Sequence, residues 1–203
     1  NILITAANIS LHNLLFVANV ADLVSFITVG GTSLASDLTI SQCEFRDTSS
    51  TLNALSVLTG NATAQNLAGL NFVDNEIISL GTTAATTALI TGAAQNRVKL
   101  YRNFGTWAVL NDEPCFLRMG GAHLQFYMGY NVLNKPATES ATEATFVITS
   151  GTCTGVALHN MSWQLDAVAG VWISTGSTLG MIENYSPITG AAEKSGLINP
   201  ATA

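Results

Sequence analysis

A repeat of about 29 residues constrains the fold of this chain more than any other feature. A short apolar segment that ends in glycine recurs along the sequence, as in "FITVGG", "ALITG" and "VWISTG". The six glycines of this motif are Gly30, Gly60, Gly92, Gly120, Gly151 and Gly176. Consecutive members are separated by similar intervals, so the motif is regular along the chain. Self-similarity at such a period indicates an architecture of stacked structural repeats.

A second motif keeps the same spacing. In this motif an apolar residue is followed three positions later by a small residue or asparagine, and five positions later by another apolar residue. Its copies are "LHNLLF", "ISQCEF", "FVDNEI", "LYRNF", "MGYNVL" and "LHNMSW", which begin at Leu11, Ile40, Phe72, Leu100, Met128 and Leu158. Because two independent motifs share one period, chance similarity is a poor explanation.

The segments between the turn residues favour strands over helices. They are short and β-branched, and they lack the i, i+3, i+4, i+7 apolar pattern of helical repeats. Leucine-rich and propeller signatures are absent as well. We therefore predict an all-β fold, a right-handed parallel β-helix or solenoid of about six turns, in which strands stack about 4.8 Å apart. Residues 1–188 would form this single domain, and residues 189–203 would form a C-terminal capping tail.

Asparagines and glycines are the predicted structural residues of the turns. Asn75, Asn103 and Asn131 recur at one constant interval and should form an inward column. Asparagine at a turn tolerates the left-handed conformation, and its side chain can hydrogen-bond to the asparagine of the next turn. The repeated glycines should lie at corners that need positive φ or a close approach of the backbone.

The period, the asparagine column and segments such as "LTISQCEF" and "LNFVDNEI" resemble a known family. They are similar to the right-handed parallel β-helix of pectate-lyase-like proteins, in the Thr-, Ala- and Asn-rich form found in bacteriophage virions. The resemblance covers residues 7–188. It implies a homotrimer on the virion exterior, in contact with capsid or tail subunits. Since the sequence begins at Asn1, we expect it to be part of a longer chain whose N-terminal part is missing.

The composition agrees with a protein that is covered by neighbours. Charged residues make up 10% of the chain and hydrophobic residues 48%, whereas about a quarter of the residues in ordinary soluble domains are charged. Large weakly charged surfaces are a liability for a free monomer. We therefore favour a non-enzymatic structural protein that decorates or stabilises a phage capsid, or that forms a tail appendage.

Several other partners are disfavoured by the sequence. The net charge is −6 with 7 Lys and Arg, so the chain lacks the basic face that nucleic acid requires. Apolar runs are interrupted before they reach the roughly 18 residues of a membrane helix. The nucleophile-elbow, phosphate-loop and dinucleotide signatures are missing, so no cofactor is predicted.

An enzymatic function is the main alternative. Glu44 and Glu76 occupy the same position of adjacent repeats and should stack about 5 Å apart, close to the carboxyl separation in retaining glycosidases. With Asp74 they would be the catalytic residues of a tailspike-like hydrolase or lyase that acts on host polysaccharide. A surface ladder gives the same spacing, so we favour no catalytic residue. We expect Asp74 to form a salt bridge with Arg102, and a secreted β-helical adhesin is the third hypothesis.

Metal binding is not predicted. His12 and His159 both belong to "LHN" copies, but in the first and sixth repeats they would lie about 24 Å apart. One ion cannot be bound by both imidazoles at about 2 Å. The resemblance implies that a lyase of this fold has a calcium site formed by several Asp residues. No two Asp residues of this chain fall in one register of adjacent repeats.

Overall fold

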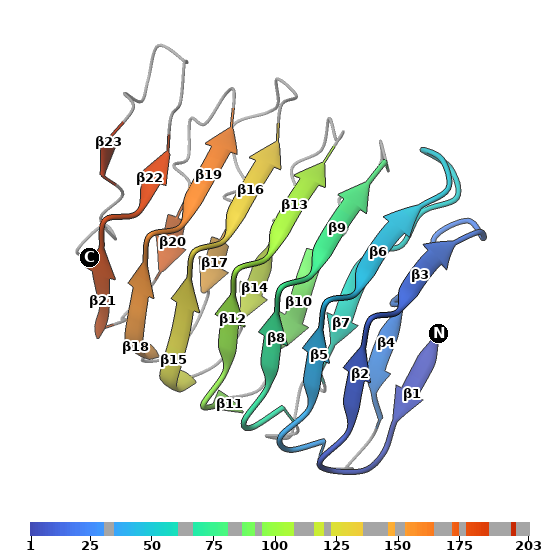
Figure 1. Cartoon of the computed structure of the whole chain (residues 1–203), viewed down its shortest axis with the longest axis horizontal. Coiled ribbons are helices and arrows are strands. Elements are labelled where there is room, and N and C mark those ends of the chain that lie inside the picture. The colour runs from blue at the N-terminus through green and yellow to red at the C-terminus, as the bar shows by residue number, and fades with distance from the viewer. Residues whose placement is uncertain are drawn as a thin grey trace.

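The computed structural model describes residues 1–30, 35–60, 67–80, 87–91, 95–107, 116–119, 123–135, 146–148, 153–164, 172–174, 178–186 and 196–197. Every regular element in these parts is a β-strand, and the strands form three long sheets (Figure 1). We call them sheet 1, sheet 2 and sheet 3 in the order in which the chain first visits them.

Each sheet is assembled from strands that are far apart in the sequence. Sheet 1 contains β1 (Ile2–Ile4), β4 (Ile27–Val29), β7 (Ser56–Thr59), β10 (Thr87–Thr91), β14 (Leu117–Met119), β17 (Phe146–Ile148) and β20 (Trp172–Ser174). Sheet 2 contains β2 (Ser10–His12), β5 (Thr39–Ser41), β8 (Asn71–Val73), β11 (Gln95–Asn96), β12 (Lys99–Tyr101), β15 (His123–Gly129), β18 (Cys153–Leu158) and β21 (Thr178–Ile182). Sheet 3 contains β3 (Leu15–Ala18), β6 (Glu44–Asp47), β9 (Glu76–Ser79), β13 (Phe104–Trp107), β16 (Val132–Lys135), β19 (Met161–Gln164), β22 (Tyr185–Ser186) and β23 (Gly196–Leu197).

Each turn of the chain adds a strand to every sheet, and successive turns pair in parallel. Figure 1 shows this stack running from the blue N-terminal turn to the red C-terminal turn. The predicted all-β parallel solenoid and its period are therefore confirmed. The predicted number of turns is slightly too low, because sheet 1 stacks seven strands. The extra turn was missed because β1 is followed by Thr5 and not by the glycine that marks the other turns.

The interior consists of columns of like side chains that stack from turn to turn. One column on sheet 2 contains Ile40, Phe72, Leu100, Met128 and Ala157, all at most 2% exposed. These residues occupy the same position of successive strands, so each packs on its equivalent above and below. Burying such a side chain contributes about 1.5–3 kcal/mol, and the solenoid repeats this contribution at every turn.

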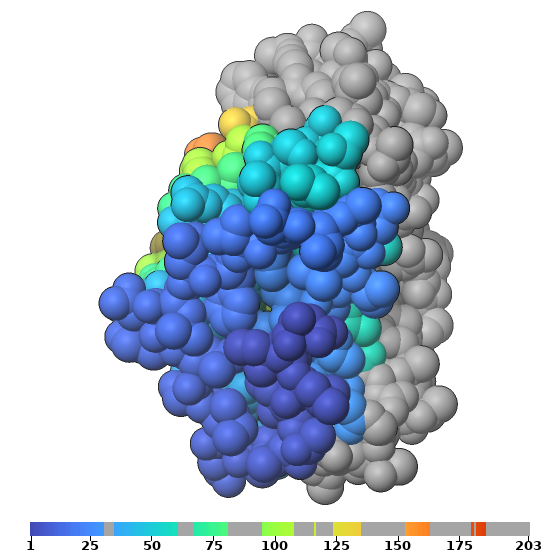
Figure 2. Space-filling view, turned by 90° about the vertical axis from the view of Figure 1, so that its right-hand side faces the viewer, coloured from blue at the N-terminus to red at the C-terminus, as the bar shows by residue number. Residues whose placement is uncertain are grey.

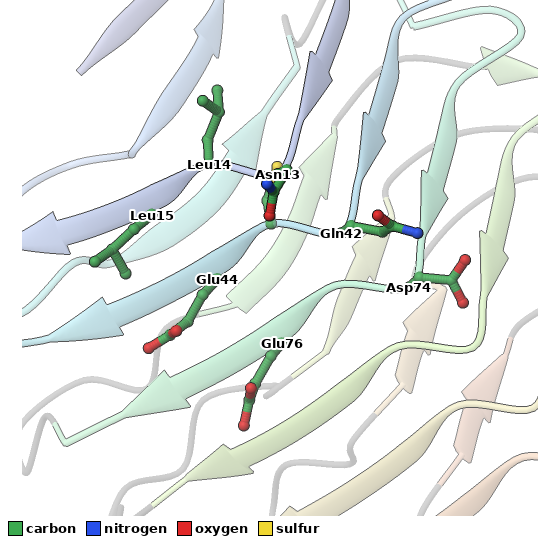
Figure 3. A pocket seen from close by; sticks show the side chains of 8 residues that line it. Asn13, Leu14, Leu15, Gln42, Glu44, Asp74 and Glu76 are labelled. Carbon is green, nitrogen blue, oxygen red and sulfur yellow. The ribbon is translucent and has the colours of Figure 1, made fainter.

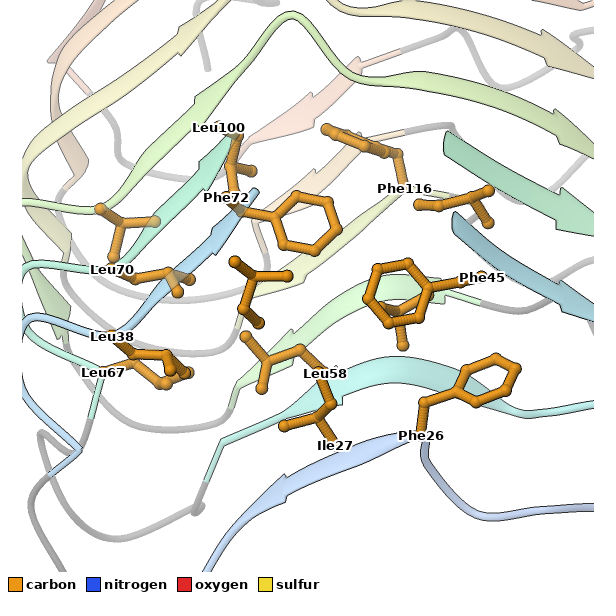
Figure 4. Packing of buried hydrophobic residues seen from close by; sticks show 14 of the residues in the cluster. Phe26, Ile27, Leu38, Phe45, Leu58, Leu67, Leu70, Phe72, Leu100 and Phe116 are labelled. Atoms are coloured by element: carbon orange, nitrogen blue, oxygen red, sulfur yellow. The ribbon is translucent and has the colours of Figure 1, made fainter. Parts of the chain in front are cut away.

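Aromatic stacking fills part of the core near the N-terminal turns (Figure 4). The Phe45 ring lies 4.6 Å from the Phe16 ring and 6.1 Å from the Phe72 ring, measured between centroids. Further along the stack Gly105 makes room for the buried Trp107, because a Cβ at Gly105 would lie 2.1 Å from the Trp107 ring. Here glycine is required by a close approach inside the core and not by a turn.

The corner between sheets 2 and 3 is held by a ladder of buried asparagines. The Oδ1 atom of Asn103 accepts from the backbone N–H of Asn75 (3.0 Å) and from its Nδ2 (3.1 Å). The Oδ1 atom of Asn131 accepts in the same way from Asn103, at 3.0 and 2.9 Å. The ladder continues through Asn160 to Asn184, two members that the sequence prediction did not include.

The amide protons of the ladder that do not point to the next asparagine are also satisfied. Nδ2 of Asn103 donates to the Phe72 carbonyl at 3.0 Å, and Nδ2 of Asn131 donates to the Leu100 carbonyl at 3.0 Å. Each side chain therefore ties together strands of three successive turns. A buried polar network is stabilising when every member is satisfied, as it is here.

The left-handed backbone conformation lies one residue before each asparagine. The φ angles are 58° at Asp74, 52° at Arg102 and 56° at Tyr130. Asn75, Asn103 and Asn131 do not have positive φ themselves, so the left-handed conformation that asparagine tolerates at turns is adopted by the residue before each of them. The less favourable left-handed backbone conformation therefore lies at the rim of the corner, outside the buried asparagine ladder.

We predicted that the repeated glycines lie at corners that need positive φ or a close approach of the backbone, and the structure describes two of them. Gly30 and Gly60 are described, and neither has positive φ. At Gly30 a Cβ would lie 2.7 Å from Cδ1 of Leu3 in the preceding turn, so a larger residue would have to displace this exposed side chain. The other four glycines lie outside the described residues: Gly92, Gly120, Gly151 and Gly176.

His12 and His159 do not share a column, so the register predicted for the last motif copy is wrong. Leu158 pairs with Gly129, and the last copy therefore begins at Ala157 and not at Leu158. His12 belongs to the column that leads to Leu158, whereas His159 lies at the corner rim beside Tyr130. The two "LHN" strings are equal in letters but occupy different positions of the repeat.

The predicted capping tail is described only at Gly196–Leu197. This short strand, β23, pairs antiparallel with β22, whereas the other strand pairings of the described chain are parallel. The rest of residues 189–203 lies outside the described residues, so the capping role stays a prediction.

Candidate functional site

The three predicted catalytic carboxylates line one hollow. Glu44 and Glu76 pair in register on β6 and β9, and Asp74 occupies the corner rim beside them. The hollow has a volume of about 350 Å³. In Figure 3 the carboxylates of Glu44 and Glu76 lie on one side of the corner, and that of Asp74 lies on the other. The structure thus brings the three residues together without making their carboxylates converge.

Two of these carboxylates are engaged in ion pairs. Asp74 binds Arg102 of the next turn through two contacts, Nε to Oδ1 at 2.6 Å and Nη2 to Oδ2 at 2.7 Å. The predicted salt bridge is confirmed, and hydrogen bonding to Asp74 raises the pKa of Arg102 above its ordinary value. Glu44 contacts Arg46 Nη1 at 3.3 Å. Both carboxylates therefore already have a cationic partner within the protein.

Sheet 3 presents an apolar column to solvent. Its members take the same outward position on four successive strands. They are Phe104 (43% exposed), Val132 (41%), Met161 (44%) and Tyr185 (47%). We call this surface the sheet 3 stripe. It continues the column of Glu44 and Glu76, so the outer face of sheet 3 changes from acidic to apolar at Phe104.

The first turn exposes further apolar side chains at the N-terminal end of the stack. Leu3 is 62% exposed, Val20 52% and Val24 68%. Figure 2 looks onto this end, where the first turn covers the front of the molecule in blue. No described segment covers these side chains.

The outer face of sheet 2 presents aromatic rings and cations, in contrast to the apolar sheet 3 stripe. Tyr101 lies 5.8 Å from Tyr127 and 5.5 Å from Tyr130, and Tyr130 lies 4.9 Å from His159, all between ring centroids. Lys99 Nζ lies 4.9 Å from the centre of the Tyr101 ring and 6.0 Å from that of Tyr127. We call these five residues the tyrosine patch.

Charged groups surround the tyrosine patch on the corner rim. Arg102 packs over Tyr101 with its Cζ 4.7 Å from the ring centre, and His159 Nδ1 lies 3.2 Å from a Glu183 carboxylate oxygen. Burial raises the pKa of Tyr127, and Tyr101 and Tyr130 raise it further. The Tyr127 phenol therefore stays protonated at neutral pH and remains able to donate a hydrogen bond.

The sequence analysis did not find the tyrosine patch. Tyr101, Tyr127 and Tyr130 occupy three different positions of the repeat, so a search for matching columns does not group them. They meet because β12 and β15 are neighbours and because each ring reaches diagonally to the next. The signal available in the sequence was the local density of tyrosine from Tyr101 to Tyr130.

Other kinds of site find little support among the described residues. Within them, no group of three or more His, Cys, Asp or Glu side chains is placed to hold a metal ion. Cys43 and Cys153 are buried, and burial raises the pKa of the Cys153 thiol to about 11. No helix long and apolar enough to cross a membrane occurs in the described part of the chain.

No protein-family model matches this chain, and neither curated proteins nor solved structures give a significant match. Function is therefore inferred from the side chains that the solenoid presents.

Proposed function

We propose that this protein is a non-enzymatic structural component of a bacteriophage virion, exposed on the particle and assembled as a homotrimer. It would decorate or stabilise the capsid or form part of a tail appendage. The observation that carries the proposal is the sheet 3 stripe, in which four large apolar side chains in one register are each more than 40% exposed. Contiguous apolar surface of this kind marks a protein contact.

The shape of the stripe favours a long contact between rods. Its four residues are spaced by the rise between stacked strands, about 4.8 Å, so they form a straight line along the solenoid. A second copy lying alongside can bury the whole line without any change of backbone.

The assembly proposal is tested by the mass of the protein in solution. We expect wild type to show about three times the chain mass of 21.2 kDa, and Val132→Glu/Met161→Glu to be monomeric. A matched control, Thr39→Glu, places a negative charge on the outer face of sheet 2 and should stay trimeric. Light scattering after size exclusion measures all three, and a monomeric wild type would overturn the proposed trimer.

The virion proposal needs a separate measurement. We expect the protein to copurify with phage particles through a density gradient and to be labelled by antibody on intact particles. Labelling that requires disruption of the particle would contradict an exterior position. Absence from purified particles would overturn the virion assignment and would leave the secreted adhesin as the better hypothesis.

A polysaccharide depolymerase is the second candidate function, because Glu44, Glu76 and Asp74 line one hollow. The ion pairs of Glu44 and Asp74 argue against it. Release of reducing ends from host surface polysaccharide is the measurement that decides. Turnover by wild type that is lost in both Glu44→Gln and Glu76→Gln would replace the structural proposal by the enzymatic one.

A further inference from the structure

Lys99 is a cation without a carboxylate partner on the described surface. The other two basic residues of its turn are paired: Arg97 contacts Asp37 at 3.2 Å, and Arg102 contacts Asp74 at 2.6 Å. Lys99 forms no ion pair with any described residue, and its ammonium lies over tyrosine rings instead. Such a cation–π contact holds the group in place and leaves its hydrogen-bond donors available to an external anion.

The rings beside Lys99 are arranged to present apolar surface with polar tips. Gly129 lacks a side chain next to Tyr127, and a Cβ there would lie 2.9 Å from the Tyr127 hydroxyl. The Tyr127 side chain can therefore lie along the sheet over Gly129. Tyr130 stands at 83° to Tyr101 and closes one end of the patch. Tyrosine combines an apolar ring with a hydroxyl that seeks a hydrogen-bond partner.

We propose that the tyrosine patch binds an acidic saccharide. The C–H face of a sugar ring would pack on Tyr101 and Tyr127, and its hydroxyls would hydrogen-bond to the phenols. A carboxylate or sulfate on the sugar would pair with Lys99 through a charge-assisted hydrogen bond. The patch spans two adjacent strands, β12 and β15, so only a short stretch of a saccharide chain would be in contact at a time.

A protein partner fits this surface less well than it fits sheet 3. Stable protein contacts bury about 800 Å² per partner around an apolar centre. The tyrosine patch is small. In the outward column of Lys99 and Tyr127 its neighbours are Asn71 on one side and Val156, followed by Gly180, on the other, so one half-buried valine is the apolar surface that adjoins the patch in this column. Nucleic acid is opposed by the net charge of −6 and by Asp74 and Glu183 on the rim.

Binding is tested with a panel of short oligosaccharides that carry uronate, sialate or sulfate groups, each with a neutral counterpart. Calorimetry measures affinity, and saturation-transfer NMR reports which sugar protons contact the protein. We expect at least one acidic member to bind more tightly than its neutral counterpart. Lys99→Gln should lower that affinity roughly tenfold and abolish the preference for the acid.

Two further variants separate the rings from the charge. Tyr127→Ala should weaken binding of the acidic and neutral sugars alike, about tenfold, since it removes a central aromatic contact. Arg46→Gln is the matched control because it removes one positive charge from the outer face of sheet 3. It should bind as wild type does. Lys99 is on the surface, so Lys99→Gln tests the proposal even if Tyr127→Ala fails to fold.

The inference does not depend on the proposed trimer, because no residue of the sheet 3 stripe takes part. Binding of no acidic member of the panel would overturn it. Equal affinity of Lys99→Gln and wild type for the acidic sugar would overturn it as well. If Tyr127→Ala changed the oligomeric mass without any saccharide binding by wild type, the tyrosine patch would be a protein contact instead.

Discussion

The outer faces of sheets 2 and 3 meet at one corner and are made by the same repeat, yet they differ in chemistry. Sheet 3 exposes an aliphatic and aromatic line, Phe104, Val132, Met161 and Tyr185. Sheet 2 exposes tyrosines that lie beside the Lys99 ammonium. We therefore propose a protein partner for the outer face of sheet 3 and a saccharide for the outer face of sheet 2.

This difference shows how a solenoid separates folding from function. Inward positions are constrained because each side chain must pack on its equivalent, as Leu100 does on Phe72 and Met128. Outward positions have no such constraint, so one column runs from Val73 through Tyr101 to Gly129. Two neighbouring faces can therefore acquire different partners while the stack remains the same.

Disrupting the corner should impair the outer faces of sheets 2 and 3 together, because the asparagine ladder supports both sheets. Asn131→Ala removes the acceptor of the backbone N–H of Asn103 and leaves that buried donor unsatisfied. Lost hydrogen bonds and orphaned buried groups cost about 1–3 kcal/mol each, so we expect a loss of about 3–5 kcal/mol. Urea unfolding measures it, and saccharide binding and assembly should be lost together.

The matched control for the ladder is Asn134→Ala. Asn134 lies on β16, close to Asn131 in the chain, and it is only partly buried. Exposed substitutions away from special features usually change stability by less than about 0.5 kcal/mol. Equal unfolding midpoints for Asn131→Ala and Asn134→Ala would show that the ladder does not stabilise the corner.

Gly69→Ala should disturb the sheet 2 face alone. Gly69 has a φ of 78°, and a Cβ there would lie 2.2 Å from Asp37 Oδ1 and 3.1 Å from Arg97 Nη2. The substitution adds backbone strain and blocks an ion pair that spans two turns, so we expect a loss of about 1–3 kcal/mol. Gly180→Ala, whose Cβ would meet its nearest atom at 3.5 Å, should be nearly neutral in the same urea titration.

Features that recur in every repeat could be predicted from the sequence. Groups of outward side chains that come from different positions of the repeat could not. Period, sheet stacking, the Glu44–Glu76 register and the Asp74–Arg102 ion pair all follow from residues that keep the same place in successive repeats. Such features depend on one alignment of the repeat, which the two motifs supply. They could therefore be deduced without coordinates.

Features that depend on single-residue register or on diagonal contacts were not deducible. The string "LHN" occurs at Leu11 and at Leu158, but its asparagine lies at the rim in one copy, Asn13, and in the ladder in the other, Asn160. Both placements satisfy the apolar pattern equally well. The tyrosine patch escaped notice for a related reason, since its rings belong to different columns.

A pair of tyrosines with equal exposure sharpens the comparison of the two faces. Tyr130 is 46% exposed on the sheet 2 side of the corner, and Tyr185 is 47% exposed in the sheet 3 stripe. Tyr130→Ala should lower saccharide affinity by roughly three- to tenfold and leave assembly unchanged. Tyr185→Ala should raise the dissociation constant of the assembly by a similar factor and leave saccharide affinity unchanged.

Calorimetry and light scattering on both variants give four values. The proposed roles of the two faces require that Tyr130→Ala changes only the saccharide affinity and that Tyr185→Ala changes only the assembly. If either variant impaired both measurements, the two faces would be coupled and the proposed separation of their roles would be wrong.

The smallest expected effect concerns the protonation of Tyr127. Burial raises its pKa in the folded protein above the unfolded value of about 10. The fold therefore binds the phenolic proton more tightly than the unfolded chain does. The stability that this proton contributes is fully present below the unfolded pKa, and it is lost as pH rises through the folded pKa.

Tyr127→Phe should accordingly gain stability relative to wild type on going from about pH 7 to about pH 11. The other tyrosines are common to both proteins, so their titration cancels in the difference between the two urea midpoints. Since the ring is retained, the sheet 3 assembly should be unaffected at neutral pH. If the difference between the two urea midpoints were constant with pH, the Tyr127 phenol would be solvated like that of a free tyrosine. The tyrosine patch would then be more hydrated, as a surface for a sugar, than the geometry indicates.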